Sequence, residues 1–117
     1  MKTDRELLEL AARAAGVRHI EYTNDYDGAR GLMMCDEHGR HTDAWSPLTD
    51  DGDALRLAVK LSLCVFVNGM FVHADCQHCP GGDIGFFEEN SARHSGCIYT
   101  ATRRAIVRAA AAIGEAM

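Results

Sequence analysis

The segment ATRRAIVRAAAAIGEAM, residues 101–117, reads as one long amphipathic helix rich in small side chains. Its apolar residues recur at helical spacing and would form a single buried face. They are Ile106, Ala109, Ala110 and Ile113. We predict a helix over residues 99–116. The abundance of alanine here and in the first segment favours helices that pack closely, with a sheet supplying the bulk of the core.

The segment CVFVNGMFVH, residues 64–73, carries the strongest hairpin signal in the chain. Asn68 and Gly69 tolerate the positive φ angles of a tight two-residue turn, and β-branched or aromatic residues flank them on both sides. His73 follows the strand alternation, and Cys35 and Cys64 read as small buried strand residues. A loop is expected over residues 75–85, with an optional further strand over 84–88.

The preceding segment, WSPLTDDGDALRLAVKL at residues 45–61, predicts a second helix over 51–61. Pro47 disfavours helix at the residue before it, and Thr49 or Asp50 is a suitable N-cap. The aspartates of this region suit the positive end of a helix dipole and lack the spacing of a calcium loop. Trp45 is expected to anchor the core. The residues predicted to face the core are Leu55, Leu57, Ala58 and Leu61.

The first predicted helix, over residues 3–15, has clear ends. Thr3 and Glu6 match a capping box, in which a hydroxyl and a carboxylate each accept a hydrogen bond from a free backbone amide. Gly16 stands where a left-handed C-terminal residue is favoured. The residues predicted to be buried are Leu7, Leu10, Ala11 and Ala14.

Between the two helices, three short strand-like runs separated by polar turns predict an antiparallel meander over residues 19–23, 31–35 and 40–45. The complete order is α-β-β-β-α-β-β-(β)-α, which is typical of the α+β class. We predict a single domain over residues 1–117, in which three helices pack on one face of an antiparallel sheet. A chain of 117 residues is long enough for one such core and short for two.

The composition is that of an ordinary globular protein, with 47% hydrophobic and 25% charged residues. The formal net charge of −5 makes the chain a poor general binder of phosphate backbones. No apolar run approaches the roughly 18 residues of a membrane span, so no membrane partner is expected. The early acids of MKTDRELLEL do not fit a signal peptide, which favours a cytoplasmic location with reduced cysteines.

Soft metal ligands cluster between residues 73 and 97. Cys76 and Cys79 are separated by two residues. His94 and Cys97 repeat that spacing, so the four side chains could hold zinc in tetrahedral geometry. The first pair could also form a redox motif, but Pro80 follows where a helix N-terminus would be needed. Because the remaining domain holds enough apolar residues to fold unaided, the leading interpretation assigns no metal and no cofactor, and zinc is an alternative.

The sequence contains no nucleophile elbow, P-loop, H-E-x-x-H or dinucleotide fingerprint, so no catalytic residue is assigned. A Cys–His pair is a weaker option, because such partners meet in space and not in sequence. Three arginines near the end of the sequence could contact nucleic-acid phosphates. They are Arg103, Arg104 and Arg108. Pairing with Glu88, Glu89 or the acidic second helix is the favoured interpretation for them.

Three blocks carry a resemblance to a known family. They are TDRELLELAARAAG, WSPLTDDGDALRLAVKL and ATRRAIVRAAAAIGEAM, which together cover about half of the chain. In this order and spacing they resemble a family of small uncharacterised phage and prophage proteins, whose pattern combines W-x-P-L-x-x-D-x-D-A-L with an A-T-R-R-A-I helix. The resemblance implies a bacterial or phage context and transfers no catalytic residue. It places Cys76, Cys79 and His94 in the variable part of the family, which argues against a shared role for them.

These observations predict a non-enzymatic accessory protein that binds a protein partner through its sheet or loop surfaces. The first alternative is a zinc-stabilised binding module using Cys76, Cys79, His94 and Cys97. The second is a nucleic-acid-binding accessory protein using Arg103, Arg104 and Arg108. An enzyme with a reactive thiol is the third.

Overall fold

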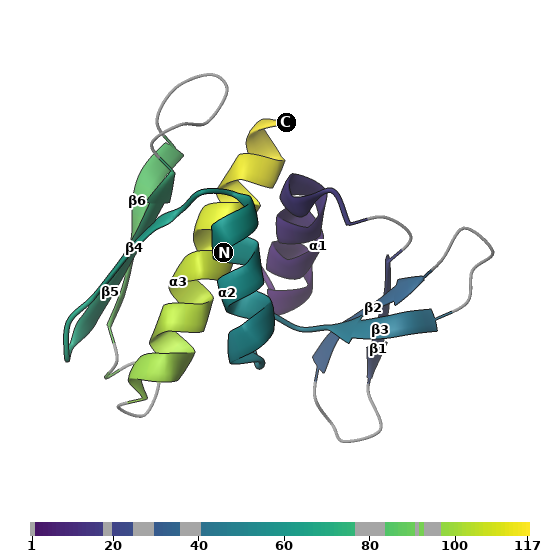
Figure 1. The fold of residues 1–117 in the computed structure, drawn as a ribbon, viewed down its shortest axis with the longest axis horizontal. Helices are drawn as coiled ribbons and strands as arrows, with labels where there is room; N and C mark the ends of the chain where they lie inside the picture. The colour runs from purple at the N-terminus through teal and green to yellow at the C-terminus, as the bar shows by residue number, and fades with distance from the viewer. Residues whose placement is uncertain are drawn as a thin grey trace.

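The computed structural model describes residues 2–17, 20–24, 30–35, 41–76, 84–90, 92 and 97–117. Within these ranges, three helices and six strands follow one another along the chain (Figure 1). In order, they are α1 (Asp4–Ala15), β1 (Ile20–Asn24), β2 (Arg30–Cys35), β3 (His41–Trp45), α2 (Asp51–Lys60), β4 (Cys64–Val67), β5 (Phe71–Cys76), β6 (Ile84–Asn90) and α3 (Ile98–Ala116). The predicted α+β class and element order are confirmed, including the optional strand. No helix in the described ranges combines the length and apolar content needed to cross a bilayer.

The strands form two antiparallel sheets instead of the single sheet that the sequence predicts. One sheet has the order β1-β2-β3 and the other β4-β5-β6. The helices lie between them, with β5 and β6 against α3 and with β2 reaching α1 on the other side (Figure 1). Antiparallel neighbours need only short turns, so each group of three consecutive strands completes its own ladder, while α2 separates the two groups along the chain.

Helix α3 is the centre of the molecule because it is buried on two sides. One side packs with α1 and α2 through Ile106, Val107, Ala110 and Ala111. The other side packs against β5 through alanines that contact Val72 and Ala74. These alanines are Ala101, Ala105 and Ala109. All four residues of the predicted apolar face are buried, and the apolar surface is wider than predicted because it serves both a helix layer and a sheet.

Helix α1 has the ends that the sequence predicts. Glu6 N–H donates to the Thr3 hydroxyl at 3.2 Å, Thr3 N–H donates to the Glu6 carboxylate at 3.3 Å, and Gly16 ends the helix with φ 71°. The buried stripe is rotated from the predicted one, because Leu10 and Ala14 are only half-buried. Its members are Leu7, Leu8, Ala11, Ala12 and Ala15.

Helix α2 begins at the Asp50 cap, whose carboxylate accepts from Asp53 N–H at 2.8 Å. Trp45 is buried in the cluster that α1, α2 and α3 share, which confirms its predicted place in the core. The prediction for Leu55 is wrong, since its side chain is 64% exposed and Ala54 faces the core in its place. The buried face of α2 consists of Ala54, Leu57 and Ala58.

The hairpin of β4 and β5 is confirmed, but its turn differs from the predicted one. Neither Asn68 nor Gly69 has a positive φ. Instead, the Asn68 side-chain oxygen accepts from Met70 N–H at 2.9 Å and from Phe71 N–H at 2.8 Å. Asn68 N–H donates to Phe71 C=O at 3.0 Å, which closes the ladder. The side chain of Asn68 therefore stabilises the turn by accepting hydrogen bonds, whereas the sequence predicted that positive φ angles would form the turn.

Gly114 allows α1 and α3 to approach closely, and we expect Gly114→Ala to destabilise the fold. A Cβ at this position would meet the Leu10 carbonyl, with its carbon at 2.8 Å, and backbone cannot rotate aside as a side chain can. The free energy of unfolding should fall by about 1–3 kcal/mol, the cost of an overpacked core. Urea titration followed by circular dichroism measures the change.

The matched control is Gly52→Ala in α2, where the new Cβ would meet only side-chain atoms, the nearest being the flexible guanidinium of Arg56 at 3.1 Å. An alanine in a helix is favoured over glycine by roughly 0.5–1 kcal/mol, so this variant should be neutral or more stable. Equal losses in both variants would contradict the assigned role of Gly114.

Candidate functional site

The structure describes two of the four side chains in the predicted zinc set. Cys76 ends β5, is buried and is disulfide-bonded, so the expectation that all five cysteines are reduced is wrong for this one. Cys97 caps α3 with a free thiol. Cys79 and His94 lie outside the described residues. Within the described ranges no three His, Cys, Asp or Glu side chains are grouped to hold a metal ion.

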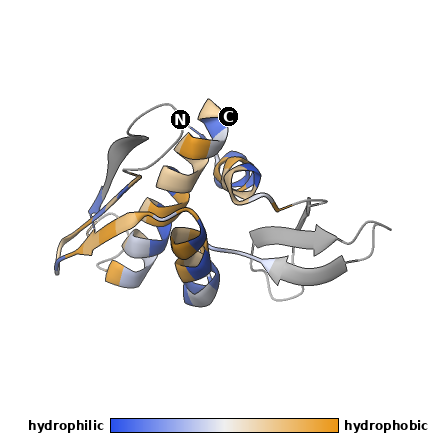
Figure 2. Ribbon diagram, turned by 45° about the horizontal axis from the view of Figure 1, so that its top comes forward, coloured by the Kyte–Doolittle hydropathy of each residue, from blue (hydrophilic) through white to orange (hydrophobic). Residues whose placement is uncertain are grey.

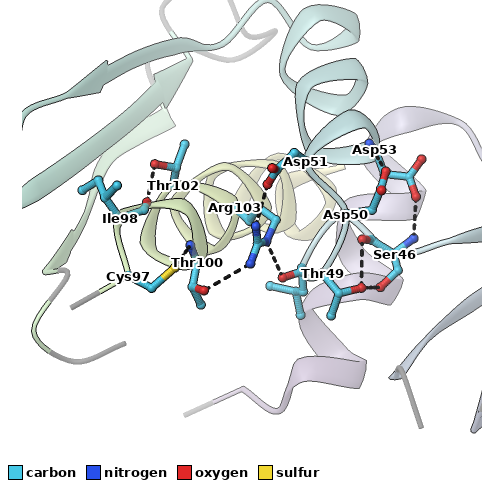
Figure 3. A network of polar contacts seen from close by, with 11 residues as sticks. Ser46, Thr49, Asp50, Asp51, Asp53, Cys97, Ile98, Thr100, Thr102 and Arg103 are labelled. Carbon is cyan, nitrogen blue, oxygen red and sulfur yellow. Dashed lines mark hydrogen bonds and ion pairs between the residues drawn. The ribbon is translucent and has the colours of Figure 1, made fainter. Parts of the chain in front are cut away.

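The Cys97 thiol sits at the positive end of α3. It accepts a hydrogen bond from Thr100 N–H at 3.5 Å (Figure 3). The pKa of the thiol is lowered, chiefly by hydrogen bonding from Thr100 through its side chain and backbone and also by the nearby charge of Arg103. The cysteine therefore replaces the usual Ser, Thr or Asp of an N-cap, a role that its position two residues before the predicted helix start could have indicated.

The three arginines of the nucleic-acid alternative all contact acids inside the molecule. Arg103 donates to Leu48 C=O at 2.9 Å and pairs with Asp51 of α2 at 2.5 Å (Figure 3). Arg104 pairs with Asp4 of α1 at 2.9 Å. Arg108 pairs with Glu89 of β6; the Nη1–Oε1 distance is 2.7 Å. They link α3 to its neighbours. The partners of Arg103 and Arg108 are among those that the sequence predicted, whereas Asp4 of α1, the nearest partner of Arg104, was not predicted.

Glu89 is the one buried charged residue in the described part of the chain, at 5% exposure. Its carboxylate lies 2.7 Å from Arg108 and 3.8 Å from the Nε of Arg104. A buried carboxylate needs such partners, because its desolvation is costly when it stands alone. Glu89 therefore fixes the position of β6 against α3, and it holds the β4–β6 sheet in place.

The opposite face of that sheet is less buried than the face against α3. Burial alternates along β5, so that Val72, Ala74 and Cys76 face α3 while His73 and Asp75 point away from it. Register places Cys64 beside Asp75 and Phe66 beside His73. We call the residues on this side of the hairpin the outer face. They are Cys64, Phe66, His73 and Asp75, and with Val65 they line a shallow hollow of about 490 Å³.

The outer face combines a thiol, an imidazole, a carboxylate and an aromatic ring. Phe66 packs edge-on against the His73 ring, with centroids 6.0 Å apart. Among the described residues no hydrogen bond joins Cys64 to His73, and Asp75 Oδ1 is buried with no hydrogen-bond partner. A nucleophilic thiol needs a base within hydrogen-bond reach, and no hydrogen bond between described residues joins Cys64 to such a base. It provides apolar area with a few polar groups, which suits recognition of another molecule.

The exposure of strand β4 is the feature that the sequence did not predict. It is an edge strand of its sheet, and all four of its residues are exposed, including Cys64, which was predicted to be buried. Phe66 is 62% exposed, and Met70 at the turn is exposed as well. We call β4 and Met70 the apolar edge. The signal that could have revealed it is the charge-free run CVFV, which no polar alternation interrupts.

We expect Glu89→Gln to destabilise the protein by about 1–3 kcal/mol, less than the full cost of breaking a buried ion pair because Arg104 and Arg108 both reach solvent. Asp4→Asn is the control, since the exposed Asp4–Arg104 pair should contribute less than about 1 kcal/mol. Chemical denaturation of both variants measures the difference. A loss no greater for Glu89→Gln than for Asp4→Asn would contradict the role assigned to the buried carboxylate.

We expect the Cys97 thiol to be alkylated faster near neutral pH than a thiol of ordinary pKa, because its lowered pKa leaves more thiolate. Thr100→Val removes the hydroxyl that makes the largest contribution and should move the midpoint of the alkylation rate to higher pH. The measurement is the rate of iodoacetamide labelling against pH, with the modified peptide identified by mass. An unchanged midpoint would rule out the assigned cause.

Comparisons with known proteins add no further assignment. No protein family matches the sequence, and no curated protein or solved structure matches the chain. The resemblance to phage and prophage proteins stays a prediction from the three sequence blocks. The functional interpretation therefore depends on the geometry of the arginine contacts, the outer face and the apolar edge.

Proposed function

We propose that this chain is a non-enzymatic accessory protein of phage or prophage type, which acts by binding a protein through its β4–β5 hairpin. The observation that carries the proposal is the apolar edge. Figure 2 shows β4 as a hydrophobic strand at the rim of the molecule. Folded proteins usually protect an edge strand with charges, proline or a bulge, because an open edge pairs with other chains. The four residues of β4 carry none of these protections.

The anchoring of the hairpin supports the same proposal. Val72 and Ala74 of β5 are fully buried against α3 and hold the sheet in place. Phe66 and Met70 are outside both buried clusters and are largely exposed. Their burial therefore contributes little to folding, and the cost of exposing them to water would be recovered only on association.

The two alternative functions would require the molecule to give up contacts that it makes. Zinc binding by the Cys76 set needs a thiolate at a position that carries a disulfide. Phosphate binding by Arg103, Arg104 and Arg108 needs these side chains to leave their ion pairs with Asp51, Asp4 and Glu89. Neither rearrangement is needed for binding through the hairpin.

Site-specific photocrosslinking in cells tests the proposal. A photoreactive phenylalanine analogue at position 66 should give a discrete protein adduct, because this ring would lie inside the interface. The matched control is the analogue at position 55, since Leu55 is an apolar residue of nearly equal exposure, 64% against 62%, on α2. No adduct at position 66, or the same adducts at both positions, would refute binding through the hairpin.

A further inference from the structure

We propose that the strand bound by the apolar edge is β4 of a second copy of this chain. The two copies would pair antiparallel about a two-fold axis at Phe66 and join their three-stranded sheets into one continuous sheet. This inference rests on the proposed function and names its partner. It follows from the phase of the hydrogen-bond ladder, from the distribution of charge between the two edges of the sheet and from the apolar area that the edge exposes.

The hydrogen bond from Asn68 N–H to Phe71 C=O fixes which backbone groups of β4 are free. Hydrogen-bonded and non-hydrogen-bonded pairs alternate along an antiparallel ladder. Counting back from Asn68 and Phe71, the pair of Phe66 with His73 and the pair of Cys64 with Asp75 are the hydrogen-bonded ones. The N–H and C=O of Val65 and Val67 therefore point away from β5, toward the open edge.

Two copies of β4 can match these free groups in one register. In this register Val65 of each copy faces Val67 of the other. Each of these two pairs forms two backbone hydrogen bonds, so the outward N–H and C=O groups of both strands are all used. Phe66 then faces Phe66 of the second copy as the close, non-hydrogen-bonded pair. The contact is the same patch on both copies, as a closed two-fold dimer requires. Aromatic side chains in such a pair add to the stability of the ladder.

The other edge of this sheet explains why pairing would stop at two copies. Strand β6 carries Glu88 and Glu89, and its ladder with β5 is irregular between Ala74 and Cys76. Charge and irregular pairing are the usual protections of an edge strand. Strand β4 has no charge to repel its own copy, so two β4 edges can pair without like charges facing each other. Head-to-tail addition of β4 to β6, which would build a filament, is disfavoured.

The exposed area indicates a weak dimer. The exposed fractions are 37% for Val65, 62% for Phe66, 49% for Val67 and 63% for Met70. If a free side chain of this size exposes on the order of 150–200 Å², the apolar edge presents roughly 300–400 Å² for each copy. A standard interface buries about 800 Å² for each partner, so this contact falls in the small, transient class. We therefore expect association at micromolar concentrations and above.

A cysteine scan tests the register. In the Phe66→Cys, Cys64→Ser variant the two new thiols would lie within disulfide distance across the two-fold axis. In the unmodified chain each Cys64 would face Asn68 of the second copy, which leaves the two Cys64 thiols about 14 Å apart. A glutathione redox buffer should therefore produce an interchain 66–66 disulfide at least tenfold faster than any 64–64 disulfide, as mapped by peptide mass. Equal rates would overturn the proposed register.

Sedimentation equilibrium tests the dimer itself. The average mass of the unmodified chain should rise toward twice the chain mass with concentration, and Phe66→Lys should stay monomeric because it places two ammonium groups face to face. Thermal melting checks that Phe66→Lys is folded, and Leu55→Lys is the matched surface control that should still dimerise. A monomeric unmodified chain at every concentration, or a dimer that survives Phe66→Lys, overturns the inference. Hairpin adducts with other proteins alone would also overturn it while leaving the proposed function intact.

Discussion

The whole structure depends on the burial of α3 from two sides. A helix that contacts both a helix layer and a sheet can come close to each only if its side chains are small, and the alanines at positions 101, 105 and 109 provide this toward β5. Toward α1, Gly114 lets the backbone of α3 lie against Leu10. Two further elements, α2 and β6, are held against α3 by arginine–carboxylate pairs.

The polar contacts around α3 have a positioning role. Arg103, Arg104 and Arg108 lie along one helix, and each reaches an acid on a different element. Apolar contacts between small side chains are not directional, so they do not by themselves fix how a neighbour is rotated or shifted. The ion pairs supply that direction, and the buried carboxylate of Glu89 does so for the sheet that presents the open hairpin.

The sequence predicted the features that depend on residues close together in the chain. It did not predict the features that depend on how the helices and sheets pack against one another. The capping box of Thr3 and the β4–β5 hairpin are set by local chemistry, and both are confirmed. The division into two sheets, the exposure of Leu55 and the exposure of Cys64 depend on which surfaces the other elements cover. The outer face also escaped prediction, because placing Cys64 beside Asp75 requires the strand register and not the spacing in the chain.

The small-residue surface of α3 has a consequence for how this fold can vary in sequence. On the sheet side of α3 a buried alanine recurs every fourth residue, and on the side of α1 Gly114 leaves no room for a larger side chain. The first sheet, in contrast, meets the helices through β2 and through Trp45 at the end of β3. Related proteins of this fold would therefore retain the periodic spacing of small residues in α3, while the amino-acid sequence of most of the first sheet could vary. A comparison weighted toward the spacing of small residues in one helix would detect distant kinship that overall identity would hide.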